Sequence, residues 1–325
     1  MKILSIIIPC FNVEAYLDNA VNSLVTAKHI DELDIIIVND GSKDKTAEIA
    51  SNYQMKYPNS VKCINKENGG HGSTINVGLQ IAVGKYINIL DGDDWYDTNS
   101  LDLLVDFLSE RNEDLVISGH YRDLITVGKV EHKKYSEMQG TLCDVNYYLS
   151  RKMEVLMTES CYKTEILKNM GLKILENTFY VDEIYCLLPF LHCNTFVFSG
   201  LSYYHYRIGD VNQSMARNNI LKRVDHKERV LEYICKETSS LSLSEEKRVF
   251  MCNRIRGLVK TILEIYYLFY NDRKDGKMKG DAFCSILSVN YPNIYRSCKN
   301  IIILYKLINF LGITEKSINN LKKII

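Results

Sequence analysis

The chain has 325 residues, of which 46% are hydrophobic and 25% charged, as in an ordinary globular protein. Forty basic residues balance forty acidic ones, so there is no net field to attract nucleic acid, and we expect no nucleic-acid partner. At this length we expect one large domain with a substantial second element.

The N-terminus and the cysteines predict a cytoplasmic protein. After the short apolar run in MKILSIIIPCFN come polar Asn12 and Glu14, where a signal peptide would continue with apolar residues. No run approaches the 18 apolar residues that a bilayer-spanning helix needs. The ten cysteines form no C-x-x-C pair, which indicates free thiols in a reducing compartment.

The first 120 residues alternate short apolar runs with longer segments of helical spacing. The runs predict strands buried on both faces at residues 4–10, 34–40, 61–65, 85–90 and 114–119. Residues 14–25 are an example of the helical segments between them. The alternation predicts an α/β fold of Rossmann type, with a mostly parallel sheet flanked by helices. From 121 to 215 the alternation loosens, and beyond 218 the segments 223–237, 245–270 and 300–313 predict amphipathic helices.

Polar residues follow four successive strands of this predicted sheet. They lie at residues 9–12, 39–42, 68–72 and 91–94. In such sheets ligands bind at the carboxyl ends of the strands, so these loops predict a pocket. There the carboxylate of Asp40 could accept a base N–H or a ribose hydroxyl, although Asp40-Gly41 also suits a plain turn.

The glycine cluster at 69, 70 and 72 is not a dinucleotide fingerprint. After Gly70 and Gly72, that motif would require a glycine at position 75, where this chain has Ile75. The motif would also follow the first strand of the sheet, whereas this cluster follows the third. Glycines still let backbone approach a ligand closely, and the following helix offers free N–H groups to a phosphate. A tight strand-to-helix turn is the alternative interpretation.

ILDGDDWY, residues 89–96, places Asp91, Asp93 and Asp94 directly after an apolar run. Two carboxylates about 4 Å apart repel by roughly 4 kcal/mol at an effective dielectric of about 20. No lysine or arginine follows within ten residues to compensate them. A bound divalent cation such as Mg²⁺ or Mn²⁺, which prefers carboxylate oxygens, would compensate this repulsion. A solvated acidic turn is the alternative.

A series of ordered motifs resembles the inverting glycosyltransferases of family 2, with their GT-A fold, of the bacterial cell-surface polysaccharide or glycoconjugate type. The motifs are SIIIPCFNVEAYLDNAVNSL, DIIIVNDGSKDKT and NKENGGHGSTINVGLQIAVGKYINILDGDDW, with weaker matches in FYVDEIYCLLPF and YRIGDVNQSM. The resemblance implies a GT-A domain over 1–215, with a nucleotide-sugar half (1–120) and an acceptor half (121–215), followed by a helical region over 216–325.

The resemblance also implies a set of site residues. Those expected to bind the nucleotide sugar are Pro9, Phe11, Glu14, Asp40, Asn68, Gly70, Asp91, Arg207 and Ser214. Asp40 would contact the base, and Asn68 would lie near the ribose. Asp91 and Asp93 match the family's D-x-D, so they are the expected ligands of Mn²⁺ or Mg²⁺, with Asp93 favoured.

One position departs from the family pattern. The family often has an arginine before the asparagine that matches Asn76, and this chain has Ile75 there. The expected cation near the donor phosphates must therefore come from elsewhere. His71 or Arg207 would substitute, although a structural role is the alternative for each, with Arg207 paired to Asp210.

Inverting transfer needs a general base on the acceptor side of the anomeric carbon. By the resemblance that base is Asp182. The family more often has Glu-Asp where this chain has Asp182-Glu183, so Glu183 is the rival, and a solvated pair on a helix face is the structural alternative. Arg207 and Ser214 would belong to a loop that closes over the donor diphosphate. Trp95 would either stack on a sugar or fill the core.

The C-terminal residues 296–325 contain six basic residues and one acidic residue. A basic amphipathic helix can bind an anionic membrane surface, so peripheral contact with the inner face of the membrane is one expectation. Packing on the protein's own core or in a homo-oligomer is the other.

The sequence thus predicts a metal-dependent inverting transferase that moves a sugar from a UDP-sugar to a hydroxyl of a glycan or lipid-linked acceptor. A sugar nucleotidyltransferase is one alternative, but it would carry a Gly-rich basic loop where this chain has PCFNVEAY. A non-catalytic sugar-nucleotide-binding or scaffold subunit is the other.

Overall fold

The computed structural model describes residues 1–135, 138–150, 156–209, 217–270 and 272–313. The chain divides into two compact units, Met1–Val211 and Asn212–Ile325. The predicted boundary between residues 215 and 216 lies outside the described residues.

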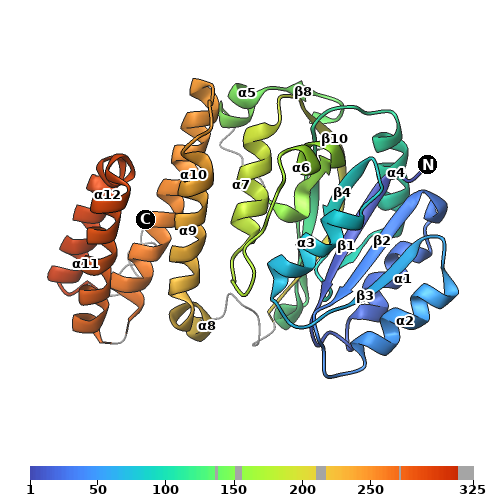
Figure 1. Ribbon diagram of the computed structural model, residues 1–325, viewed down its shortest axis with the longest axis horizontal. Helices are drawn as coiled ribbons and strands as arrows, with labels where there is room; N and C mark the ends of the chain where they lie inside the picture. Colours follow the sequence, from blue (N-terminus) through green and yellow to red (C-terminus); the bar gives the residue numbers. More distant parts are fainter. Residues whose placement is uncertain (136–137, 151–155, 210–216, 271, 314–325) are drawn as a thin grey trace. The chain divides into compact units, whose positions relative to one another are not determined.

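The first unit is built on one twisted β-sheet (Figure 1). Its described strands are β1 (Leu4–Cys10), β2 (Leu33–Asn39), β3 (Val61–Asn65), β4 (Tyr86–Ile89), β5 (Trp95–Tyr96), β6 (Leu115–Leu124), β7 (Lys129–Lys133), β8 (Leu142–Cys143), β9 (Ser160–Lys163) and β10 (Phe196–Ile208). The strand order is β3-β2-β1-β4-β9-β6-β10-β5, with β7 beside β6 and β8 beside β10.

The sheet confirms the predicted α/β fold but is more mixed than expected. Strands β3, β2, β1 and β4 are parallel to one another, as the alternating pattern predicts. Strand β9, however, is antiparallel to both β4 and β6, which it separates. The second half of the sheet therefore combines the parallel pair β6 and β10 with antiparallel edges.

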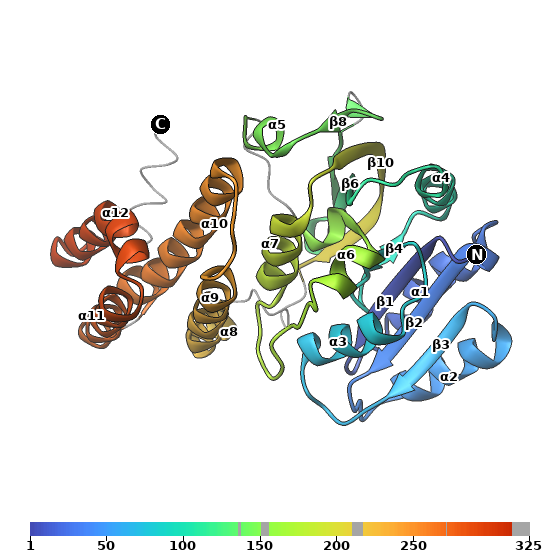
Figure 2. The same cartoon turned by 45° about the horizontal axis from the view of Figure 1, so that its top comes forward.

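Helices cover both faces of this sheet (Figures 1 and 2). Those described in the first unit are α1 (Leu17–Val25), α2 (Thr46–Lys56), α3 (His71–Ile81), α4 (Thr98–Ser109), α5 (Val145–Ser150), α6 (Thr164–Asn169) and α7 (Asp182–His192). The apolar stripes of α1 and α4 join a buried core with alternate residues of β1, such as Ile6 and Ile8. Ile7 points to the other face, where α3 crosses β1 so closely that Gly78 leaves no space for a side chain.

The second unit is helical, as the sequence predicts. Its described helices are α8 (Arg217–Lys222), α9 (Val224–Thr238), α10 (Glu245–Glu264), α11 (Arg273–Asn290) and α12 (Pro292–Phe310). A short π-helical segment, Ile265–Phe269, extends α10. Buried apolar side chains line the contacts between these helices, for example Val230, Ile262 and Ile302.

Candidate active site

A cavity of about 950 Å³ lies at the carboxyl edge of β1, β2 and β3. Among the residues predicted to bind the nucleotide sugar, it is lined by Pro9, Phe11, Asp40, Asn68 and Gly70. These residues meet because the carboxyl ends of parallel strands share one edge of the sheet. Lys66 and residues 177–179 also line the cavity. Lys66 and Phe179 stand within the quoted motifs, but the sequence analysis predicted no role for them.

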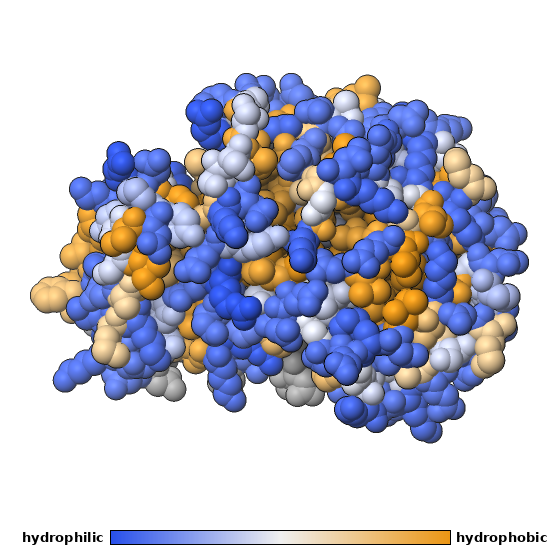
Figure 3. All heavy atoms as spheres, in the orientation of Figure 1, coloured by the Kyte–Doolittle hydropathy of each residue, from blue (hydrophilic) through white to orange (hydrophobic). Residues whose placement is uncertain are grey.

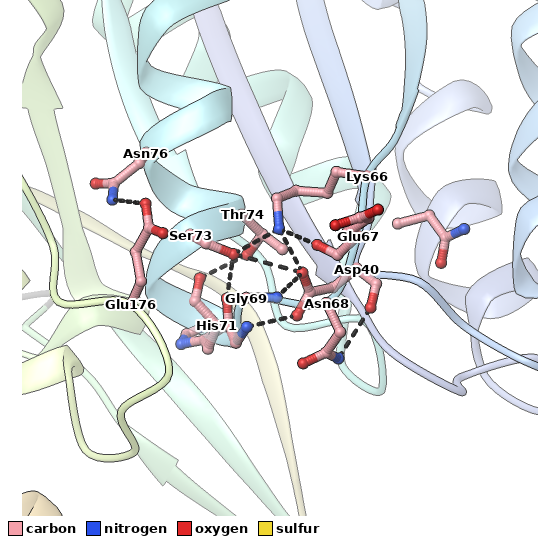
Figure 4. A network of polar contacts seen from close by, with 12 residues as sticks. Asp40, Lys66, Glu67, Asn68, Gly69, His71, Ser73, Thr74, Asn76 and Glu176 are labelled. Carbon is pink, nitrogen blue, oxygen red and sulfur yellow. Dashed lines mark hydrogen bonds and ion pairs between the residues drawn. The ribbon is translucent and has the colours of Figure 1, made fainter.

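Asp40, at the carboxyl end of β2, is the centre of a polar network (Figure 4). Its carboxylate is only 2% exposed, so the charge depends on its hydrogen-bond donors. Oδ1 accepts from Lys66 Nζ at 2.8 Å and from the Gly69 N–H at 2.9 Å, and Oδ2 accepts from the Gly70 N–H at 2.8 Å. Asn68 closes the loop by donating its side-chain amide to the carbonyl of Asp40 at 2.9 Å.

The glycine cluster packs directly against the backbone of a second segment, the loop 174–179 that precedes α7. The N–H of Asn177 donates to the carbonyl of Gly69 at 2.6 Å. A Cβ on Gly72 would lie only 2.1 Å from the carbonyl oxygen of Leu175. Asn76 holds the same loop from α3, donating to the carbonyl of Ile174 at 2.9 Å and accepting from its N–H at 2.8 Å. At Gly72 the close approach expected for a ligand is thus made by protein backbone.

The three carboxylates of the acid-rich tip have different surroundings. Asp94 is 1% exposed and accepts hydrogen bonds from the hydroxyl of Tyr204 and the N–H of Arg207, both at 2.7 Å. Burial, with the charges of Asp91 and Asp93, raises the pKa of Asp94 well above its ordinary value. Asp94 therefore ties β10 to the tip, whereas Asp91 and Asp93 are half-buried.

His71, the first residue of α3, lies beside the tip. Its Nε2 is 3.2 Å from Oδ1 of Asp91, yet this buried nitrogen has no hydrogen-bond partner among the described residues. Burial lowers the pKa of His71, but the carboxylate of Asp91, with smaller contributions from Asp182 and Asp40, outweighs it and leaves the pKa raised. The imidazole thus balances part of the negative charge that the sequence left uncompensated.

The acid-rich tip carries the carboxylates that are expected to bind a metal ion. In the part of the chain that the structure describes, no group of three or more His, Cys, Asp or Glu side chains is arranged to hold a metal ion. Asp91 and Asp93 nevertheless present hard carboxylate oxygens at the half-buried tip. This donor set fits a Mn²⁺ or Mg²⁺ ion that takes its remaining ligands from phosphate and water.

Arg207, near the end of β10, is held against the same tip. Its Nε donates to the carbonyl of Asp93 at 3.1 Å. The guanidinium lies between two aromatic rings, 4.8 Å from the ring centre of Tyr16 and 5.3 Å from that of Trp95. Trp95 also stacks on His205, with ring centres 5.0 Å apart. The tryptophan thus supports an arginine beside the acidic tip.

Asp182 begins α7 and is exposed, whereas the next residue, Glu183, is half-buried. The charge of Asp182 acts on both His71 and Tyr206, so the fold brings it near the acid-rich tip across more than 80 residues of sequence. The helix begins directly after the cavity-lining loop. The positions of Asp182 and of the donor cavity are therefore linked.

One predicted binding residue, Glu14, does not line the cavity. Glu14 joins the loop after β1 to the start of α2, since its carboxylate accepts from the N–H of Lys45 at 2.8 Å and its own N–H donates to Asp44 at 3.0 Å. A direct role of Glu14 in nucleotide binding stays a prediction. Ser214 lies outside the described residues, as does Asp210, the expected alternative partner of Arg207.

A parallel half-sheet with its polar loops at one edge, joined to a mixed half by an acid-rich turn, is the GT-A fold. Residues 5–162 match the model of glycosyl transferase family 2. This match confirms, for residues 5–162, the family predicted from the motifs.

Three known proteins illustrate the similarity. The minor teichoic acid biosynthesis protein GgaB of Bacillus subtilis is 37% identical over 114 residues, which cover 35% of this chain and 13% of GgaB. The chain thus matches a small part of this longer relative.

Among solved structures, S. aureus TarS 1–349 in complex with UDP has a TM-score of 0.58 at 18% identity, covering 96% of this chain and 92% of TarS. The mannosyltransferase PcManGT from Pyrobaculum calidifontis, in complex with GDP-Man and Mn²⁺, has a TM-score of 0.52 at 12% identity, with 95% and 87% covered. At these identities the two structures show the shared fold.

Proposed function

We propose that the protein transfers a sugar from a UDP-sugar to an acceptor hydroxyl with inversion at the anomeric carbon. The observation that carries this proposal is the cavity around Asp40 at the sheet edge, where the lining residue His71 pairs with Asp91 of the acid-rich tip at 3.2 Å. The match to family 2 supports the reaction class, and the UDP bound by TarS supports the choice of nucleotide.

In the proposed reaction, four residues of the chain have separate roles. Asp40 accepts the base N–H, and Phe11, which is 51% exposed, offers a face for the base to stack on. Arg207 stabilises the negative charge that develops on the leaving diphosphate. Asp182 removes the proton of the acceptor hydroxyl as it attacks the anomeric carbon from the side opposite the diphosphate.

Mn²⁺ or Mg²⁺ would be held by Asp93 and Asp91. When bound, the ion supplies positive charge to the diphosphate oxygens and so assists departure of the nucleotide. The Mn²⁺ in the PcManGT complex supports this part of the proposal.

The function is tested with purified protein and a panel of nucleoside diphosphates and their sugars, each with MnCl₂ or EDTA. We expect UDP with Mn²⁺ to raise the melting temperature most, because a ligand at 100 times its Kd stabilises the fold by about 2.7 kcal/mol. Release of UDP from one UDP-sugar should then depend on an added acceptor. No shift with any nucleotide would contradict the proposal, and binding without turnover under every acceptor would favour a non-catalytic subunit.

For the acceptor, we propose a glycan or lipid-linked glycan of the cell surface. The name of GgaB, a teichoic acid biosynthesis protein, supports this setting. An exposed Asp182 at the start of α7 suits a large acceptor that approaches from solvent. Incubating the protein and its UDP-sugar with surface polymers and with short oligosaccharides tests the proposal, since only acceptors of this class should gain label.

We also propose that α12 contacts an anionic membrane surface. No described helix is long and apolar enough to cross a bilayer. Hydrophobic side chains instead gather on the surface of α11 and α12 (Figure 3). The exposed apolar residues of α12 and its end are Ile303, Leu304, Leu307, Phe310 and Leu311. Arg296 and Lys299 on the same helix are also exposed, and this combination of apolar and basic residues suits anionic lipid.

Co-sedimentation with vesicles tests the membrane proposal. The parent should bind vesicles containing phosphatidylglycerol more than pure phosphatidylcholine, and Leu307→Asp with Phe310→Asp should abolish the difference. Val83→Asp, which places the same charge at an exposed apolar residue of the first unit, serves as the control. Equal binding of parent and double variant would contradict the proposal, and a change of oligomeric state instead would identify the face as an interface between copies.

A further inference from the structure

We infer that Lys66 is a positioning residue that holds Asp40 with one carboxylate oxygen toward the cavity and thereby makes the site select uracil over cytosine. The inference rests on the proposed nucleotide-sugar function and adds the residue that sets its base preference. Lys66 follows β3, outside the positions that the family resemblance identified.

Lys66 is fully engaged by the protein. An ammonium group has three N–H donors. Those of Lys66 reach Oδ1 of Asp40 at 2.8 Å, Oγ of Ser73 at 2.9 Å and the carbonyl of Glu67 at 2.5 Å (Figure 4). With its donors used in this way, Lys66 acts on a ligand through Asp40.

The network leaves Asp40 one place to bind a ligand. An ionised carboxylate offers about two acceptor positions on each oxygen. Lys66 and the Gly69 N–H occupy Oδ1, whereas among the described residues the Gly70 N–H alone donates to Oδ2. Since Asp40 lines the cavity, the second position of Oδ2 is available to a donor on the ligand.

This single acceptor distinguishes the two pyrimidines. The ring nitrogen N3 of uracil carries a proton and can donate to Oδ2. That of cytosine carries none and presents a lone pair to the carboxylate, which is repulsive. The discrimination depends on Oδ2 facing the cavity. Lys66 supports that orientation, because its ammonium holds the other oxygen, Oδ1, at 2.8 Å.

The ammonium of Lys66 is itself held by a residue of α3. Ser73, on the first turn of α3, holds the ammonium in place, donating to the carbonyl of Gly70 while accepting from Lys66.

The test compares UDP and CDP binding, each with Mn²⁺, by calorimetry. The two ligands share the diphosphate, so the ratio of their Kd values isolates the base. In Lys66→Met we expect the Kd for UDP to rise by about 10- to 100-fold, the loss of a charged hydrogen bond, while the Kd for CDP changes less. The preference for UDP should fall at least about tenfold, and Lys66→Arg should restore most of it.

Two further variants complete the design. Lys43→Met removes a positive charge from the cavity rim and should weaken UDP and CDP equally. Ser73→Ala removes one hydrogen-bond partner of Lys66 and should lower the preference for UDP over CDP by a few-fold. If Lys66→Met does not fold, this variant tests the role of Lys66 in its place. A parent that binds no nucleotide overturns the proposed function. A parent that prefers UDP, with variants at 66 and 73 that keep the ratio, overturns the role of Lys66.

Discussion

Replacing Asp182 with asparagine is expected to lower kcat by about 10²- to 10⁴-fold, the usual contribution of a general base. The amide keeps the size of the side chain at the start of α7 but cannot accept the acceptor's proton. Asp182 is exposed, so the fold should tolerate the change. Affinity for UDP should stay unchanged, because Asp182 lies outside the network around Asp40. Steady-state transfer assays with parallel calorimetry of UDP binding measure both quantities.

Two other substitutions serve as the control for Asp182→Asn and as the test of the rival base. Glu165→Gln neutralises an exposed carboxylate in the first turn of α6 and should leave kcat unchanged. Glu183→Gln tests the rival base. If Asp182→Asn retains full turnover and Glu183→Gln does not, the base is Glu183.

Replacing Asp93 with asparagine is expected to weaken Mn²⁺-dependent UDP binding by about 100-fold or more, since even outer-sphere partners of a metal contribute 10- to 100-fold. The backbone of the tip should remain in place, because Arg207 donates to the backbone carbonyl of Asp93, which the substitution keeps. Calorimetric titrations of UDP with and without Mn²⁺ measure the effect, and Mn²⁺ titrations followed by electron paramagnetic resonance measure metal binding directly.

Asp97→Asn is the matched control for Asp93. Asp97 lies four residues further on and caps α4 by accepting from the N–H of Ser100 at 2.8 Å. Asparagine caps a helix as well as aspartate does, so this variant should keep both stability and Mn²⁺ dependence. Identical UDP affinity with and without Mn²⁺ in the parent protein would remove the metal from the proposal.

The parallel half of the fold was predictable from the sequence because its signals are local. Strand β1 has the predicted bounds of 4–10, and β3 those of 61–65. Short runs of β-branched residues buried on both faces identify such strands, and their order in the chain implies a common carboxyl edge. Asp40 and Asn68 could thus be assigned to one pocket before any coordinates were known.

The mixed half depends on long-range pairing that no local pattern encodes. Strand β9 has four residues and lies between β4 and β6, which precede it by dozens of residues. Its sequence SCYK shows no strand alternation. The contact of residues 174–179 with α3 and the ion pair of Lys66 with Asp40 likewise join segments that sequence motifs treat separately.

The backbone contact at Gly72 has a consequence for how this enzyme could acquire new acceptors. The carbonyl of Leu175 occupies the space that any side chain at position 72 would need. Asn76 forms a hydrogen bond with the neighbouring residue Ile174. Asp182 follows that loop at the start of α7. In the proposed mechanism, the spacing between the leaving group and the base Asp182 therefore depends on Gly72 and Asn76, which do not line the cavity. Replacing the loop 174–179 with one of another length would broaden acceptor specificity only if the residues at positions 72 and 76 were changed as well.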